Sequence, residues 1–213
     1  MSKKTCWGII FLLLIFVIIT TLNFFGYFTK ANLEVCNFFL DVRTPELNNL
    51  FLSITYLGDK YFVAIVVALT MLYLWWKNRL ALKFSAMFET LVCGTSALAA
   101  VLVGNFIKVL LAIERPLDRI GEWNGFSFPS GHTTLSTLMM GLLWIFVFSD
   151  IKNNAWRKFS GLICYLLPFL VGVSRLYLGA HWLADVFGGW LLGMIFILVV
   201  VKINKNSHKF QLA

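Results

Sequence analysis

Three cations, two histidines and one carboxylate interrupt or border long apolar segments of this sequence. They are Lys108, Arg115, Arg175, His132, His181 and Asp185. Ionisable side chains at membrane depth are costly, which makes them candidates for a functional site. Lysine and arginine neutralise phosphoryl oxygens, and the arginine fork binds two oxygens at once. These residues therefore favour chemistry on a phosphate ester.

The two histidines suit a phosphoryl transfer. One imidazole can attack phosphorus while the other protonates the leaving oxygen. Asp185 follows His181 by four residues, so the two side chains would share one face of a helix. The carboxylate can then hold one ring proton of His181 and raise the nucleophilicity of the other nitrogen.

A short turn of residues 129–132, with the sequence Pro-Ser-Gly-His, precedes an apolar segment. The first backbone N–H groups of a helix have no partner within it and favour an anion. Glycine at position 131 lets the backbone approach a ligand closely. We therefore expect Ser130 and Gly131 to bind phosphate. Each residue alone has an ordinary explanation, such as a cation reaching toward lipid headgroups, and only the combination indicates a site.

Long apolar segments must position these residues. The chain has 213 residues, of which 60% are hydrophobic and 13% charged, whereas soluble globular domains are about 45–50% apolar and about 25% charged. A membrane-spanning helix needs about 20 mostly apolar residues. Six segments approach or exceed this length, at residues 7–28, 57–76, 84–113, 132–148, 159–173 and 182–201. We predict an all-α membrane helix bundle with six transmembrane helices, forming one domain over residues 1–213.

Residues 29–56 are of mixed polarity and predict an extramembrane connector with a helix in the interface. Six spans place both termini on one side of the membrane, and lysine and arginine are enriched in cytoplasmic loops. The face with the termini carries a net charge of +10 and the opposite face −1, so both termini are predicted to be cytoplasmic. The basic residues of the first face are Lys3, Lys4, Lys77, Arg79, Lys83, Lys152, Arg157, Lys158, Lys202, Lys205 and Lys209.

This topology gathers the chemical residues at one depth. Segments 84–113 and 159–173 end at the outer face, and segments 132–148 and 182–201 begin there. If the helix after Lys108 continues, Arg115 lies two turns further on the same face. Trp123 and Phe126, in the polar loop before the turn, fit anchors at the membrane interface or guides for a lipid.

Other classes of partner are disfavoured. The net charge of +8 includes no block of five or more basic residues, so a nucleic-acid partner is not expected. The four cysteines, Cys6, Cys36, Cys93 and Cys164, lie far apart and have no metal-site spacing. We therefore predict neither a disulfide framework nor a metal or other cofactor.

At these residues the sequence resembles the type 2 phosphatidic acid phosphatase superfamily, whose signature has three parts. K-x6-RP matches Lys108 and Arg115-Pro116, PSGH matches residues 129–132, and SR-x5-H-x3-D matches Ser174-Arg175, His181 and Asp185. The matched region, residues 108–185, contains all three parts in order with the correct internal spacing. The resemblance is therefore specific.

The resemblance implies metal-independent hydrolysis of phosphate monoesters or diphosphates through a phosphohistidine. It assigns His181 as nucleophile, Asp185 as its orienting partner and His132 as the acid for the leaving group. The implied phosphate-binding set is Lys108, Arg115, Ser130, Gly131 and Arg175. Bacterial members act on undecaprenyl diphosphate, phosphatidylglycerol phosphate, phosphatidic acid or lipid A, and the signature does not distinguish these.

We therefore expect a lipid phosphatase of the cytoplasmic (inner) membrane of a bacterium. Its active site would face the periplasm or exterior, its substrate would be a membrane lipid phosphate, and no obligate protein partner is predicted. A lipid phosphotransferase or a lipid A phosphatase with the same site remains an alternative. A transporter or scaffold that binds a lipid headgroup is the non-enzymatic alternative.

Overall fold

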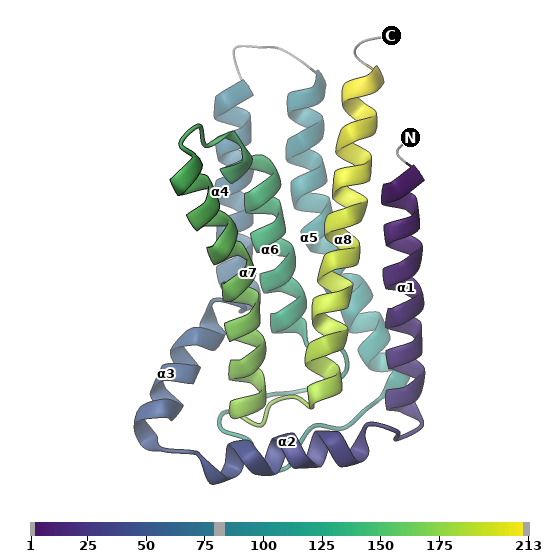
Figure 1. Ribbon diagram of the computed structural model, residues 1–213, viewed down its shortest axis with the longest axis vertical. Coiled ribbons are helices and arrows are strands. Elements are labelled where there is room, and N and C mark those ends of the chain that lie inside the picture. Colours follow the sequence, from purple (N-terminus) through teal and green to yellow (C-terminus); the bar gives the residue numbers. More distant parts are fainter. Residues whose placement is uncertain (1–2, 79–83, 211–213) are drawn as a thin grey trace.

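The computed structural model describes residues 3–78 and 84–210, with the side chains of residues 3–77 and 87–205. The regular elements in these ranges are helices, and no strand occurs in them. They are α1 (Lys3–Phe24), α2 (Thr29–Asp41), α3 (Pro45–Tyr56), α4 (Lys60–Asn78), α5 (Phe84–Leu111), α6 (Gly131–Phe146), a short 3-10 helix (Phe148–Asp150), α7 (Asn154–Tyr177) and α8 (Leu183–Phe210). The predicted all-α class is confirmed (Figure 1).

Six of these helices, α1 and α4 to α8, are long and apolar enough to cross a membrane, as predicted. They run along the long axis of the molecule, and the two termini lie at the same end (Figure 1). The fifth span begins at Asn154 rather than at residue 159. The side chain of Asn153 accepts hydrogen bonds from the backbone N–H groups of Ala155 and Trp156, which caps the additional polar turn.

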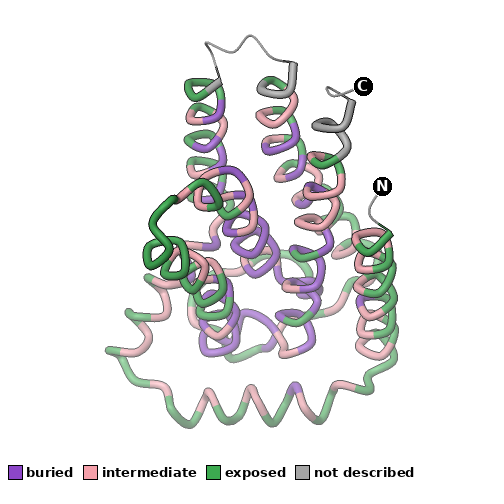
Figure 2. The backbone as a smooth tube through the Cα atoms, turned by 45° about the horizontal axis from the view of Figure 1, so that its top comes forward, coloured by how far each residue is buried: buried purple, intermediate pink, exposed green. Residues whose placement is uncertain are grey.

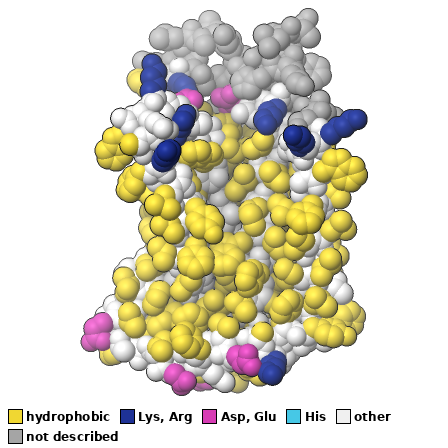
Figure 3. All heavy atoms as spheres, viewed as in Figure 1, with side chains coloured by type: hydrophobic (Ala, Val, Ile, Leu, Met, Phe, Trp, Pro, Cys, Tyr) yellow, Lys and Arg dark blue, Asp and Glu magenta, His cyan; other side chains and the backbone are white. Residues whose placement is uncertain are grey.

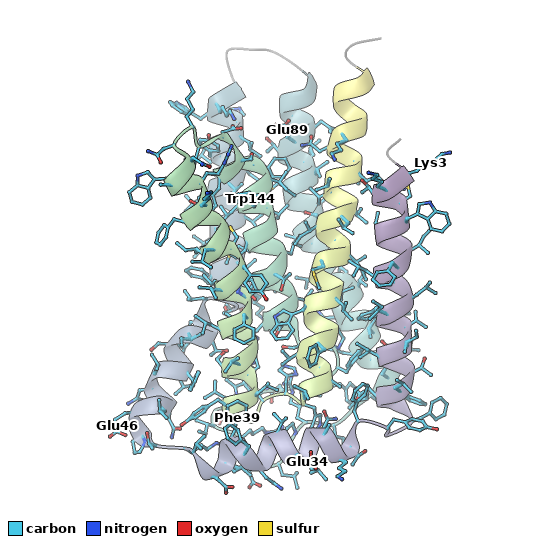
Figure 4. All side chains as sticks on the ribbon, viewed as in Figure 1. Lys3, Glu34, Phe39, Glu46, Glu89 and Trp144 are labelled. Atoms are coloured by element: carbon cyan, nitrogen blue, oxygen red, sulfur yellow. The ribbon has the colours of Figure 1, made fainter. Side chains whose placement is uncertain are left out.

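The predicted connector contains two helices, and α2 lies across the end of the bundle opposite the termini (Figure 1). Arg43, between α2 and α3, donates from Nε to the carbonyl oxygen of Tyr177 at 3.2 Å. The ring of Tyr177 stacks on Phe51 at 4.2 Å between centroids. The ring of Tyr177 also makes an edge contact with Phe39 of α2, at 6.0 Å between centroids. Phe39 lies near the end of α7 (Figure 4). These contacts fasten α2 and α3 to the end of α7.

Buried residues concentrate on α6 and α8 in the middle of the bundle (Figure 2). A Cβ atom at Gly189 of α8 would lie 2.8 Å from the carbonyl oxygen of Ser130 and 2.8 Å from Cβ of Thr133. Glycine is therefore required for this close helix contact. The contact brings the starts of α6 and α8 together, where the backbone N–H of Ser130 donates to the carbonyl oxygen of Asp185 at 3.0 Å.

Charges are separated along the long axis. A hydrophobic band covers the middle, while most of the visible lysines and arginines lie toward the end with the termini (Figure 3). Lys3 and Glu89 lie toward that end, and Glu34 and Glu46 lie at the opposite end (Figure 4). Arg79 and Lys83 of the predicted basic set lie outside the described residues, and so does the side chain of Lys209.

Candidate active site

A cavity of about 350 Å³ lies toward the end of the bundle opposite the termini. Its walls come from the starts of α4 and α6, the last turns of α5 and α7, the 112–130 connector and the turn before α8. Six of the eight predicted site residues line it: Lys108, Arg115, Gly131, His132, Arg175 and His181. Ser130 and Asp185 are completely buried directly behind this wall. The structure thus brings the whole predicted set together.

The tautomer of His181 follows from its two partners. Arg115 Nη1 lies 3.0 Å from Nε2 of His181, and guanidinium nitrogens only donate, so Nε2 must accept. The ring proton is therefore on Nδ1, which lies 3.3 Å from Oδ2 of Asp185. This arrangement leaves a lone pair on Nε2, the nitrogen at the cavity, and holds the other nitrogen against a carboxylate.

Asp185 is fixed by further donors. The backbone N–H of Trp182 donates to its Oδ2 at 2.7 Å, and the hydroxyl of Ser127 donates to the same oxygen. The predicted shared helix face is not what aligns His181 with Asp185, because α8 begins only at Leu183. His181 precedes the helix, and the first turn of α8 folds the carboxylate back toward it.

Arg115 also lies off the helix, which corrects the conditional expectation that α5 continues. The helix ends at Leu111, and Ala112 adopts a left-handed conformation with φ of 49°. Pro116 further disfavours helical backbone at Arg115. Arg115 reaches the cavity from the connector, where its Nη1 donates to the carbonyl oxygen of Ala180 at 2.6 Å.

Lys108, near the end of α5, and Arg115, in the connector, also shape the loop around the cavity. Lys108 Nζ donates to the carbonyl oxygens of Phe126 and Ser127, both at 2.8 Å. Arg115 Nε donates to the carbonyl oxygen of Gly125 at 2.8 Å. The same positive groups that line the cavity therefore fold the loop that closes one side of it.

Arg175 is almost completely buried in the last turn of α7. Its Nη1 donates to Oγ1 of Thr55 at 2.8 Å, and its guanidinium lies 3.8 Å from the ring centroid of Trp123. Its Nε is buried and has no partner among the described residues. A buried donor without a partner is costly, and an anion in the cavity is a natural acceptor for it.

The start of α6 forms another part of the cavity wall. The N–H groups of its first turn have no partner within the helix, and a Cβ atom at Gly131 would meet only open space. The hydroxyl of Ser130 accepts from Thr133 Oγ1 at 2.9 Å and does not line the cavity. Ser130 thus contributes the geometry of the turn, whereas Gly131 leaves room in front of it.

Burial sets the charge of the two site residues that lie outside the spanning segments. Burial first, and then the charges of Arg175, Arg115 and Lys108, hold the pKa of His181 well below its ordinary 6.5. His181 is therefore neutral at physiological pH, as a nucleophile requires. Burial also lowers the pKa of Arg115, although the carboxylate of Asp185 partly opposes this.

The residues of the cavity could bind an anion and supply a nucleophile. Three cations and a helix N-terminus surround a neutral imidazole with an available ring nitrogen. Among the residues that the structure describes, no group of three His, Cys, Asp or Glu side chains is arranged to hold a metal ion. The arrangement fits attack on a phosphate ester.

Several residues that support the site could not be assigned to it from the sequence pattern. Thr55 lies in the last turn of α3, Asp59 lies between α3 and α4, and Ser127 lies in the polar connector. Trp123, expected as an interfacial anchor or lipid guide, is half-buried against Arg175 instead. Each acts through a contact with a residue far away in the sequence, which local spacing does not reveal.

The fold and the cavity together define a helical membrane protein with a phosphate site at one end of its bundle. The model of the PAP2 superfamily matches residues 89–209, and the chain belongs to this superfamily, a family of membrane lipid phosphatases. The resemblance seen in the sequence, and with it the class of integral membrane lipid phosphatase, is confirmed.

Individual relatives agree with this assignment. The chain is 26% identical over 171 residues to phosphatidylglycerophosphatase B of Bacillus subtilis (strain 168), covering 80% of this chain and 81% of the relative. It is 30% identical over 120 residues to an undecaprenyl-diphosphatase of Sulfolobus acidocaldarius, covering 53% of each. A crystal structure of a transmembrane PAP2 type phosphatidylglycerolphosphate phosphatase from Bacillus subtilis matches with a TM-score of 0.82 at 24% identity, over 93% of this chain and 96% of that one. This last match shows the same fold.

Proposed function

We propose that this chain transfers the phosphoryl group of a membrane lipid to Nε2 of His181 and then to water, without a metal ion. The observation that carries the proposal is the hydrogen-bonded series from Asp185 through His181 to Arg115. It leaves the reactive nitrogen unprotonated at a cavity lined by cations. The resemblance in the signature supports the same roles.

In the first step, Nε2 of His181 attacks phosphorus and the bond from phosphorus to the lipid oxygen breaks. His132, which also lines the cavity, gives its proton to that oxygen, so the lipid leaves as an alcohol. When the substrate is a diphosphate, the lipid leaves as a monophosphate. Asp185 stabilises the positive charge that His181 acquires, because its carboxylate faces Nδ1.

In the second step, water attacks phosphorus and the nitrogen–phosphorus bond breaks. His132, now neutral, accepts the proton of this water, which restores both histidines and releases inorganic phosphate. Lys108, Arg115, Arg175 and the Gly131 amide hold the phosphoryl oxygens in both steps. Arg115 donates to the very lone pair that attacks, so its guanidinium must turn from His181 to the phosphate as substrate binds.

The substrate class follows from the size of the cavity and from the relatives. A volume of about 350 Å³ accommodates a phosphate headgroup but not a lipid tail, which must lie outside. Phosphatidylglycerol phosphate and undecaprenyl diphosphate are the first substrates to test, because similar proteins carry these activities in their names. Phosphatidic acid and lipid A complete the panel.

We further propose that residues 1–213 act as one membrane-embedded domain in the cytoplasmic membrane of a bacterium. The termini would be cytoplasmic, and the cavity would face the periplasm or exterior. The charge separation supports this orientation, because the basic end carries the termini and the cavity lies toward the other end (Figure 3).

The test is phosphate release by the purified protein in detergent across this panel, with His181→Asn as the key variant. Asparagine cannot form the phosphohistidine, so we expect turnover to fall by more than about 10³-fold. A Glu34→Gln variant on the exposed surface of α2 should retain the wild-type rate, and EDTA should leave the rate unchanged. Turnover by His181→Asn at the wild-type rate would rule out the assigned nucleophile.

A labelled phosphoryl group separates hydrolysis from transfer. Brief incubation with labelled substrate and an alkaline quench should leave label on wild-type protein and none on His181→Asn, because phosphohistidine survives base. Free phosphate as the final product supports the phosphatase. Label that appears instead in a second lipid identifies a phosphotransferase. Label that stays in the intact substrate, with none transferred to the protein, identifies a binding protein.

A further inference from the structure

Residues 55–59, which form the end of α3 and the turn to α4 and are called the α3–α4 turn below, contact the site at three points, although they lie outside the signature and outside the matched residues 89–209. We propose that this turn positions the active site, and that Asp59 keeps His132 in its proton-donating form. The inference rests on the proposed role of His132 and adds a residue that holds it in that role. Asp59 is therefore a positioning residue for the first step of the reaction.

Asp59 faces His132 directly. Its Oδ2 lies 3.9 Å from Nε2 of His132, and both residues line the cavity. Its other oxygen, Oδ1, accepts from the backbone N–H of Tyr61 at 2.8 Å. One oxygen thus caps the start of α4 while the other is directed toward the histidine, so the orientation of the carboxylate is fixed by the fold.

Gly58 holds the turn against α6. A Cβ atom at this position would lie 2.8 Å from the carbonyl oxygen of His132, 3.1 Å from its Cβ and 2.7 Å from Cγ1 of Val171. Any side chain here would push the turn away from the start of α6. Because Gly58 has no side chain, the backbone of Asp59 lies close to His132. The packing of the turn therefore brings the two side chains together.

Thr55 makes the third contact, through the hydrogen bond that Arg175 Nη1 donates to its hydroxyl. Thr55 is almost completely buried, at 1% exposure. The same short turn therefore orients a phosphate-binding cation at one end and faces the proton donor at the other. A shift of the turn would disturb both at once.

The electrostatics around His132 show why a carboxylate is needed. Charged or titratable side chains line the cavity around His132 from the turn before α4, the start of α4, α5, the connector, α7 and the turn before α8, and Asp185 of α8 lies behind them: Asp59, Lys60, Lys108, Arg115, Glu122, Arg175, His181 and Asp185. Lys108, Arg115 and Arg175 bring positive charge to this part of the cavity. Asp185 is already engaged by His181 and Ser127, and the side chain of Glu122 is exposed at the cavity mouth.

Asp59 is therefore the carboxylate that offsets these cations at His132. An opposite charge within about 4–6 Å favours the charged form of a titratable group, and the bound phosphate adds to this effect. The protonated imidazole is what the breaking bond from phosphorus to the lipid oxygen requires. When the proton passes to the leaving alcohol, His132 becomes neutral.

The test compares two phosphate esters in the Asp59→Asn variant. Asparagine retains an oxygen for the cap of α4 but removes the charge. For an alkyl phosphate, whose leaving oxygen needs a proton, we expect kcat/KM to fall by about 10-fold or more. For a nitrophenyl phosphate, whose leaving group departs as a stable anion, we expect a change of less than about 3-fold. The quantity kcat/KM is chosen because it reports the step in which the leaving group departs.

The pH profile gives a second readout. Loss of the Asp59 charge makes His132 lose its proton at lower pH, so the alkaline fall in kcat/KM for the alkyl ester should begin about one pH unit lower. Asp59→Glu should restore the wild-type profile. Asp118→Asn, which removes an exposed carboxylate of the connector that does not line the cavity, should behave as wild type.

The possible failures are distinguishable. Equal losses of kcat/KM with both esters, with an unchanged alkaline fall, would show that Asp59 only supports the fold. A wild-type pH profile and wild-type kcat/KM for Asp59→Asn would show that Asp59 has no role. Either result overturns this inference but not the proposed function. Wild-type protein that releases no phosphate from either ester or from the lipid panel overturns the proposed function and this inference with it.

Discussion

The proposed nucleophile, His181, must be neutral to attack phosphorus, and its surroundings keep it neutral. It is almost fully buried beside Arg115, and burial together with three cations holds its pKa well below 6.5. A depressed pKa means that the neutral form persists as pH falls through 6.5. The nucleophile is therefore available over a wider acidic range than that of an exposed histidine.

The first prediction concerns this acidic range. We expect kcat/KM to show no fall near pH 6.5 that is due to the enzyme, because His181 takes up its proton only at much lower pH. The measurement is a pH–rate profile corrected for the second ionisation of the substrate phosphate, which lies near pH 6. An enzyme-derived acidic limb with a midpoint at or above 6.5 would contradict the neutral buried histidine.

The second prediction concerns Trp123, whose ring covers the guanidinium of Arg175 at 3.8 Å. A cation–π contact of this kind has a strength of about 0.5–2 kcal/mol. In Trp123→Leu we expect KM to rise by roughly 3- to 30-fold, with a smaller rise in Trp123→Phe, which keeps an aromatic face. Trp156→Leu is the matched control, because Trp156 is 62% exposed at the other end of α7. Equal KM values for all three variants would exclude a role of the ring in phosphate binding.

At the scale of the elements, the contact of α6 with α8 places the phosphate-binding turn. Gly189 allows the start of α6 to lie against α8, and the N–H of Ser130 reaches the carbonyl oxygen of Asp185. The carboxylate that faces His181 and the proposed anion-binding turn are therefore held together by this contact. The geometry of the site depends on this packing as much as on the side chains themselves.

The third prediction tests that packing. In Gly189→Ala the new methyl group would lie 2.8 Å from the carbonyl oxygen of Ser130, so the turn must shift. We expect a loss of stability of about 1–3 kcal/mol, seen as a lower thermal midpoint in detergent, together with slower phosphate release. Gly8→Ala, where the methyl group would meet Leu198 at an ordinary 3.4 Å, is the control for a contact of α1 with α8. A Gly189→Ala variant as stable and active as Gly8→Ala would contradict the close-packed arrangement.

Local spacing was informative at this scale only where the backbone is regular. It placed the six long helices, because bilayer thickness fixes the length of an apolar helix. It placed Arg115 on the face of Lys108 only on the condition that the helix continues, and this condition is not met, since α5 ends at Leu111 and the left-handed residue Ala112 turns the chain away. It also placed His181 on α8, whereas the histidine precedes that helix.

At the scale of the whole molecule, the charge distribution defines an axis. The end with the termini is rich in lysine and arginine, and Lys77 pairs there with Asp150. The cavity lies toward the opposite end. In a membrane this asymmetry favours cytoplasmic termini and an outward-facing site.

The fourth prediction tests this orientation. In a background with Cys6, Cys36, Cys93 and Cys164 replaced by serine or alanine, single cysteines are introduced as Leu117→Cys or Lys152→Cys. Leu117, in the connector near the site, is 92% exposed. We expect a membrane-impermeant maleimide to label Leu117→Cys in intact cells and Lys152→Cys only after permeabilisation. The reverse pattern would place the cavity on the cytoplasmic side.

The sequence alone determined the all-helical membrane class, the number of spans and the eight residues of the candidate site. These features rest on segment length, composition and short spacing, which are properties of the chain itself. Only the tertiary structure showed the residues that support the site. Thr55 and Arg175 are 120 positions apart, and Ser127 and His181 are 54 apart, yet each pair is in contact. Such contacts depend on which helices pack together, and no local pattern records that.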